Sequence, residues 1–170
     1  MLTVQDFSTI AGIAALVFFQ FGDGGSGGAA GASAPAQRQR YSPVPAWIFG
    51  PVWTTLYLTI TANLSHYVLA SDAAHEPSLT TAFAVLALTN LFLNKLWSVL
   101  FFGLRLVWIS AVCALLIFAT AVALAIVEAK DGEPWWSTVW LLGPYILWTL
   151  FATGLNIYVA ATGYGQQRRK

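Results

Sequence analysis

Five long apolar stretches, almost free of charged residues, constrain the fold of this chain more than any other feature. They cover residues 2–21, 46–70, 80–102, 106–127 and 136–162. The hydrocarbon core of a bilayer takes about 20 mostly apolar residues per helix. Backbone groups in lipid need hydrogen-bond partners within the segment, which a helix provides. The sequence therefore predicts an all-α integral membrane protein, a single domain over residues 1–170 built as a five-transmembrane-helix bundle.

The composition excludes several function classes. Of the 170 residues, 58% are hydrophobic and 9% charged, whereas a soluble domain has about 25% charged residues. With 8 basic against 7 acidic residues, the chain has no basic surplus for binding nucleic acid. One cysteine, Cys113, and two histidines give no metal cluster. Acidic residues fall in the loops and the N-terminus, so we expect no catalytic acid–base pair in the bundle and no metal site.

The loops predict the orientation in the membrane. Polar loops are expected at 71–78, 103–105 and 128–134, and the Gly/Ala-rich loop 22–40 is expected to be flexible. A cleaved signal peptide is disfavoured, because the first residues carry Asp6 and no basic residue. One side of the membrane receives Lys130 alone; the other receives Arg38, Arg40, Arg105, Arg168, Arg169 and Lys170. The positive-inside rule then places the C-terminus on the cytosolic side and the N-terminus outside.

Polar residues within the spans have several interpretations. Lys95, in the third span, either reaches the interface with its long side chain, which we favour, or pairs with an anionic ligand, or contacts another subunit. Four asparagines are expected to bond between helices and fix their packing. They are Asn63, Asn90, Asn94 and Asn156. For His66, an interfacial role is favoured over ligation of haem iron.

The tryptophans of the spans form a second signal. Trp53, Trp97 and Trp148 lie deeper in their spans than an interfacial aromatic belt requires. Converging rings would make a flat apolar slot suited to a planar macrocycle or a sterol. From the residues alone, the belt and the pocket remain equal alternatives.

Three motifs carry a resemblance to a known family. Residues 43–57, PVPAWIFGPVWTTLY, resemble the second-helix signature of the tryptophan-rich sensory protein family, also called the translocator protein or peripheral benzodiazepine receptor (TspO/MBR) family. Residues 94–103, NKLWSVLFFG, resemble its third-helix motif, and residues 144–148, PYILW, its fifth-helix motif. The motifs come in the family's order, and the resemblance covers about residues 40–160.

The resemblance implies a ligand cavity and its lining. The family consists of small five-helix membrane proteins, commonly dimeric, that bind porphyrins, haem and sterols; some bacterial members degrade porphyrin in light. Carried over to this chain, the implied ligand-binding residues are Trp53, Tyr57, Asn94, Trp97, Trp108, Tyr145, Trp148 and Ala152. Lys95, Arg38 and Arg40 are candidates to pair with the propionates of a tetrapyrrole.

The chain also departs from the family, and the departures keep two functions open. A Gly/Ala tract replaces the usual aromatic first loop that covers the pocket, and Ile60-Thr61 replaces a usual Met-Gly. We expect a membrane receptor or carrier whose ligand is a porphyrin, haem or other tetrapyrrole, with a sterol as a second candidate ligand. We expect no obligatory cofactor. Its partners are expected to be membrane lipids and a second copy in a homodimer. The alternative is an accessory subunit of a larger membrane complex, with a lipid or pigment in the pocket.

Overall fold

Helices account for nearly all of the described chain. The computed structural model describes residues 4–18, 44, 46–74 and 77–163, and the statements below concern these residues. The helices are α1 (Val4–Phe18), α4 (Ala46–Ala74), α5 (Pro77–Ser98), α6 (Val107–Lys130), α7 (Trp135–Ser137) and α8 (Gly143–Thr162). Two π-helical segments continue them: η1 (Val99–Gly103) follows α5, and η2 (Thr138–Leu142) joins α7 to α8. No strand occurs in this part of the chain, which confirms the all-α prediction.

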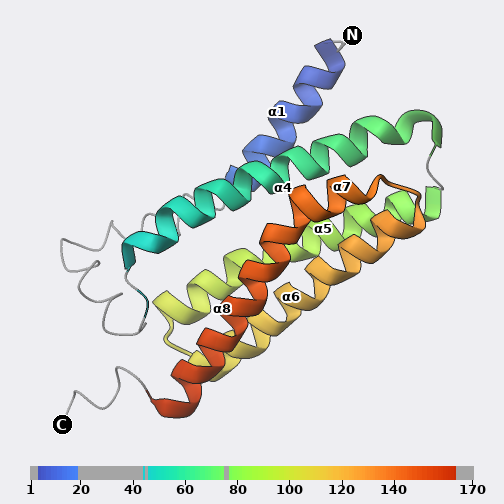
Figure 1. Ribbon diagram of the computed structural model, residues 1–170. Coiled ribbons are helices and arrows are strands. Elements are labelled where there is room, and N and C mark those ends of the chain that lie inside the picture. The colour runs from blue at the N-terminus through green and yellow to red at the C-terminus, as the bar shows by residue number, and fades with distance from the viewer. Residues whose placement is uncertain (1–3, 19–43, 45, 75–76, 164–170) are drawn as a thin grey trace.

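The helices form two groups. Helix α6 packs along both α5 and α8, and the three lie side by side in Figure 1. Helix α1 crosses α4 and packs against it, while α4 contacts η2 and, to a smaller extent, α8 (Figure 1). The α1–α4 pair thus rests against a three-helix unit.

The residue spacing of α6 explains its central place. Its buried residues follow steps of four and three along one face: Ser110, Ala114, Ile117, Ala121, Leu124 and Glu128. Small residues on such a face let helix backbones approach closely, and close packing drives helix association in lipid. Helix α5 shows the same steps through Phe83, Ala87, Asn90, Asn94 and Trp97. The polar members of both series therefore face the core.

The structure corrects several helix boundaries. Helix α4 continues to Ala74, beyond the predicted end at residue 70, and α5 begins at Pro77 instead of residue 80. Most of the predicted loop 71–78 is therefore helical. A run of apolar residues indicates the part of a helix that lies in lipid, but it does not mark where the helix ends. Polar residues also adopt helical geometry, so a helix can extend beyond the membrane into water.

The largest correction concerns the end of α6. Residues 128–130 are helical instead of belonging to the predicted loop 128–134. Glu128 is only 1% exposed, so the expectation that all acidic residues lie outside the bundle is wrong. It lies four residues after Leu124 on the buried face, and helix geometry carries it inside.

Within the described residues, three segments are long and apolar enough to cross a membrane, as expected of an integral membrane protein. They are 77–103, 107–130 and 135–162, in good agreement with three of the predicted spans. The predicted spans 2–21 and 46–70 are helical where they are described, as α1 and α4. Helix α1 is described over 15 residues only. The full count of five spans therefore stays a prediction, as does the orientation, and the loop 22–40 lies outside the described residues.

Candidate functional site

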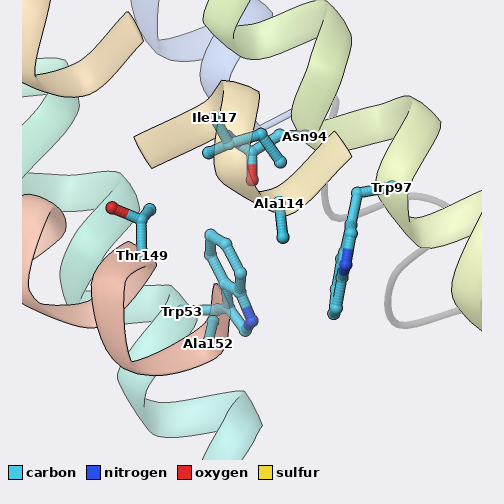
Figure 2. A pocket seen from close by; sticks show the side chains of 7 residues that line it. All are labelled: Trp53, Asn94, Trp97, Ala114, Ile117, Thr149 and Ala152. Atoms are coloured by element: carbon cyan, nitrogen blue, oxygen red, sulfur yellow. The ribbon is translucent and has the colours of Figure 1, made fainter. Parts of the chain in front are cut away.

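A small pocket lies where α4, α5, α6 and α8 meet. Its lining residues are Trp53, Asn94, Trp97, Ala114, Ile117, Thr149 and Ala152. Figure 2 shows the indole rings of Trp53 and Trp97 standing apart, with the Ala114 methyl group between them in this view. None of the lining residues is acidic or basic, so this part of the structure offers apolar and aromatic contacts and no acid–base chemistry.

Trp97 is held firmly in place. Its Nε1 donates a hydrogen bond to Oδ1 of Asn156 in α8 at 2.8 Å. Its ring stacks on Phe101, with centroids 5.3 Å apart, and meets Phe102 edge-on at 5.6 Å. The π-helical segment η1 allows both contacts, because its wider turn brings the residue five positions on, as well as the one four positions on, close to the ring. Trp97 is therefore a fixed wall of the pocket.

Trp53 forms the facing wall with a second set of aromatic rings. Its ring lies 5.3 Å from that of Tyr57, which is itself buried. Nearby in the fold, Trp148 of α8 meets Phe49 of α4 edge-on at 5.9 Å. The Nε1 of Trp148 is buried and has no acceptor among the described residues. It is thus a hydrogen-bond donor available to a ligand that reaches it.

A buried polar network supports one end of the pocket. Asn94 donates to the hydroxyl of Tyr145, which donates to Oδ1 of Asn90 at 2.5 Å. Asn90 in turn donates to the Ile117 carbonyl at 2.9 Å and to Oγ1 of Thr120 at 2.7 Å. These bonds join α5, α6 and α8, which confirms the expectation that the asparagines fix helix packing.

The structure brings together half of the eight predicted ligand-binding residues at the pocket. Trp53, Asn94, Trp97 and Ala152 line it. Tyr57 and Tyr145 lie directly behind, in contact with Trp53 and Asn94 respectively.

Other predicted residues lie elsewhere. Trp108 is 62% exposed on the outer surface of α6, where an interfacial aromatic side chain is expected. Lys95 is partly buried on α5 and is not among the lining residues. Trp148 also lies outside the lining, and Arg38 and Arg40 fall outside the described residues.

Sequence reasoning missed three lining residues: Ala114, Ile117 and Thr149. Ala114 and Ile117 belong to the buried face of α6, whose steps of four and three are readable in the sequence. Thr149 lies one helical turn after Tyr145, on the face of α8 that its buried residues share. The periodicity of these helices was the available signal.

The pocket is small in this conformation. Its volume is about 20 Å³, room for about one water molecule. Pockets that hold drug-sized ligands have volumes of about 300–1,000 Å³. A ligand of that size would therefore require the pocket to widen.

Comparison with known proteins gives a consistent result. The profile of the TspO/MBR family matches residues 12–161. The tryptophan-rich protein TspO of Archaeoglobus fulgidus is 36% identical over 115 residues, covering 68% of this chain and 69% of that protein. The translocator protein of Homo sapiens is 31% identical over 133 residues, covering 78% and 75%. Protein CrtK of Rhodobacter capsulatus is 28% identical over 137 residues, covering 72% and 73%.

Proposed function

Because this chain belongs to the TspO/MBR family of membrane proteins, we propose that it is a membrane receptor or carrier for a flat hydrophobic ligand, with a tetrapyrrole such as a porphyrin as the first candidate. A sterol is the second candidate ligand. Binding rests on burial of apolar surface and on stacking against indole rings.

The observation that carries the proposal is the pair of tryptophans on facing sides of one pocket. Trp53 and Trp97 come from different helices, and the rest of the lining is mostly small or aliphatic. Each indole ring would give an aromatic contact to a planar ring system that enters the pocket. The asparagine–tyrosine network makes its hydrogen bonds within the protein, so apolar contact dominates.

The charge partners of a porphyrin are part of the same proposal. The propionates of a porphyrin need cations near the mouth of the pocket. Lys95 follows Asn94 in α5, and Arg38 and Arg40 precede α4 in the sequence. We assign this role to these three residues as candidates.

Tryptophan fluorescence quenching by protoporphyrin IX tests the proposal in detergent-purified protein. We expect saturable quenching, with Trp53→Ala weakening binding about 2- to 10-fold, as loss of an aromatic contact worth about 0.5–1.5 kcal/mol predicts. Trp148→Ala should weaken binding as well if the ligand reaches beyond the lining to the buried Nε1 of Trp148, which has no acceptor among the described residues. Trp135→Ala is the matched control, because that side chain is 72% exposed. Equal loss in all three variants would indicate a general defect in folding and would contradict the assignment.

Absence of saturable quenching in a well-folded sample would instead favour an accessory subunit of a larger membrane complex. Co-purification from native membranes would then identify the complex. Light-dependent loss of the porphyrin spectrum that Trp53→Phe and Trp148→Phe abolish would show an enzyme that photo-oxidises porphyrin.

A further inference from the structure

A second group of polar residues joins α4 to the end of α6, at a site distinct from the pocket. On α4 it comprises Asn63, His66 and Tyr67, which share one face because they lie three and four residues apart. Their partners are Glu128 at the end of α6 and Asp131 and Glu133 just beyond it. We call these six residues the acidic latch.

The contacts of the latch are specific. Asn63 donates from Nδ2 to Oε1 of Glu128 at 2.8 Å. Nδ1 of His66 lies 3.3 Å from Oε2 of Glu133, and the Tyr67 hydroxyl donates to Asp131. Each residue of α4 thus has its own carboxyl partner.

The turn after α6 places Glu133 near Glu128. The backbone N–H of Glu133 donates to the Glu128 carbonyl at 3.1 Å, and that of Asp131 to the Val127 carbonyl at 3.0 Å. Gly132 has a φ of 79°, the left-handed conformation that this helix ending requires. The turn therefore holds Asp131 and Glu133 beside the end of α6, where they contact Tyr67 and His66 of α4.

Glu128 is the unusual member of this group. It is 1% exposed and lies in a segment apolar enough to span a membrane. Among the described residues, those that donate to its carboxyl oxygens are neutral: Asn63, and Thr138 of η2 at 2.6 Å. A buried carboxylate without a cation in contact is costly, and ionisable side chains inside a membrane segment are a mark of function.

The hydrogen bonds around Glu128 also leave an acceptor unsatisfied. Oδ1 of Asn63 is buried and finds no donor among the described residues, although Asn63 is only 2% exposed. A buried acceptor without a donor is costly, so the described part of the latch is short of a hydrogen-bond donor, and a proton on Glu128 adds one. This observation is independent of the burial of Glu128 and points in the same direction.

We propose that Glu128 is a proton-binding site that controls the attachment of α4 to the three-helix unit. With the proton bound, the neutral carboxyl group stays buried against Asn63 and Thr138, and α4 is held. When the proton leaves, the carboxylate is drawn towards water and repelled by Glu133, and α4 is released.

The titratable groups around Glu128 come from two places. His66 and Tyr67 face it from α4, and Asp131 and Glu133 from the turn after α6; η2 contributes the neutral Thr138. The side chains of residues 70–76 lie outside the described residues.

Release of α4 also affects the pocket. Trp53 precedes Asn63 by ten residues on the same helix, a distance of about 15 Å along its axis. Raising the pH therefore moves one wall of the pocket. This inference does not depend on which ligand the pocket binds.

The test measures protonation and movement separately, without a ligand. Infrared spectroscopy of the protein in lipid follows the carbonyl band of a protonated carboxylic acid. Spin labels at Ala62→Cys on α4 and Trp140→Cys on η2 follow the distance between these two segments. Both positions are exposed, and the labelled chain carries Cys113→Ala. We expect the band to disappear and the label distance to lengthen over the same pH range.

Variants distinguish a proton switch from a structural contact. Glu128→Gln should lose the band and keep the short distance at every pH, because its amide resembles the protonated carboxyl group. Glu133→Gln should shift both transitions to lower pH, because it removes the negative charge that opposes ionisation of Glu128. Lys130→Gln is the control, an exposed charge at the same helix end, and should leave both transitions unshifted.

Two results would overturn the proposal. One is a band that is absent or does not titrate in the unmodified chain. The other is a pH-dependent label distance that persists unchanged in Glu128→Gln. If Glu128→Gln does not fold, an unshifted transition in Glu133→Gln overturns it.

Discussion

At the scale of single residues, one amide group holds three helices together. Asn156 of α8 accepts from Trp97 of α5, and its Nδ2 donates to the Val107 carbonyl at 3.1 Å and to Oγ of Ser110 at 3.2 Å, both in α6. In lipid, where water does not satisfy such groups, a shared amide fixes the register of all three. The position of Trp97 in the pocket therefore depends on a residue that does not line it.

Replacing this amide should cost measurable stability. Asn156→Ala leaves the Trp97 Nε1 and the Val107 carbonyl without this partner, and we expect a loss of about 1–2 kcal/mol in the free energy of unfolding. Unfolding in mixed micelles, monitored by circular dichroism, measures it. The adjacent Ile157 is 46% exposed, so Ile157→Ala should change stability much less. Equal effects of the two variants would argue against this role of Asn156.

The small side chain of Ala152 should be required for ligand binding. A pocket of about 20 Å³ leaves little room, so Ala152→Leu would fill it and oppose its widening. We expect protoporphyrin IX to bind at least tenfold more weakly in the quenching titration, while circular dichroism shows that the helix content is retained. Ala161→Leu, at an exposed position of the same helix, is the control and should bind as the unmodified chain does.

At the scale of helices, glycines with a positive φ end both α6 and α8. Gly132 closes α6 at a φ of 79°, a conformation that a side chain disfavours by about 1–2 kcal/mol. Gly163 closes α8 in the same way, with a φ of 61°. Glycine is needed at Gly132 because the acidic latch lies on the turn it permits.

Substitution of Gly132 should therefore destabilise the chain and disturb the latch. Gly132→Ala is expected to lower the free energy of unfolding by about 1 kcal/mol. Gly154→Ala is the matched comparison, since Gly154 is inside α8 and an added Cβ would have no neighbour within 4 Å. That change should be neutral or stabilising, because alanine favours a helix over glycine by up to about 1 kcal/mol. A stabilising effect of Gly132→Ala would contradict this account of the turn.

At the scale of the whole molecule, α4 is attached differently at its two ends. Towards its C-terminus it is joined to α6 and the following turn by two hydrogen bonds and by the contact of His66 with Glu133. Towards its N-terminus its contact with α8 is aromatic, through Phe49 and Trp148. An apolar ligand can replace aromatic contacts more easily than polar ones, so we expect the pocket to widen at the aromatic end.

The orientation of the molecule in its membrane is also testable. The positive-inside rule predicts that the turn after α6 faces outward and the turn before it faces the cytosol. A membrane-impermeant thiol reagent should then label Lys130→Cys in intact cells and label Leu104→Cys only after lysis. Both positions are exposed, and the native Cys113 is 4% exposed, so its background should be low. The reverse pattern would invert the predicted topology.

The sequence by itself determined the helical membrane class and the family. Continuous apolar stretches set three of the spans within a few residues of the observed segments, because lipid requires a fixed length of apolar helix. Motifs around Trp53, Trp97 and Trp148 identified the family. Four of the residues that the family resemblance implied, Trp53, Asn94, Trp97 and Ala152, line the pocket. These features are local or repeat along one helix, and such signals can be read without coordinates.

Only the tertiary structure decided which side chains meet across helices. Trp108 resembles the other tryptophans in sequence, yet the rotation of α6 turns it outward, to 62% exposure. Glu128 reads as a loop residue, yet the continuation of α6 buries it against Asn63, which is 65 residues away in the chain. The small volume of the pocket is likewise set by how four helices pack. Such pairings depend on helix rotation and separation, which composition and hydropathy do not specify.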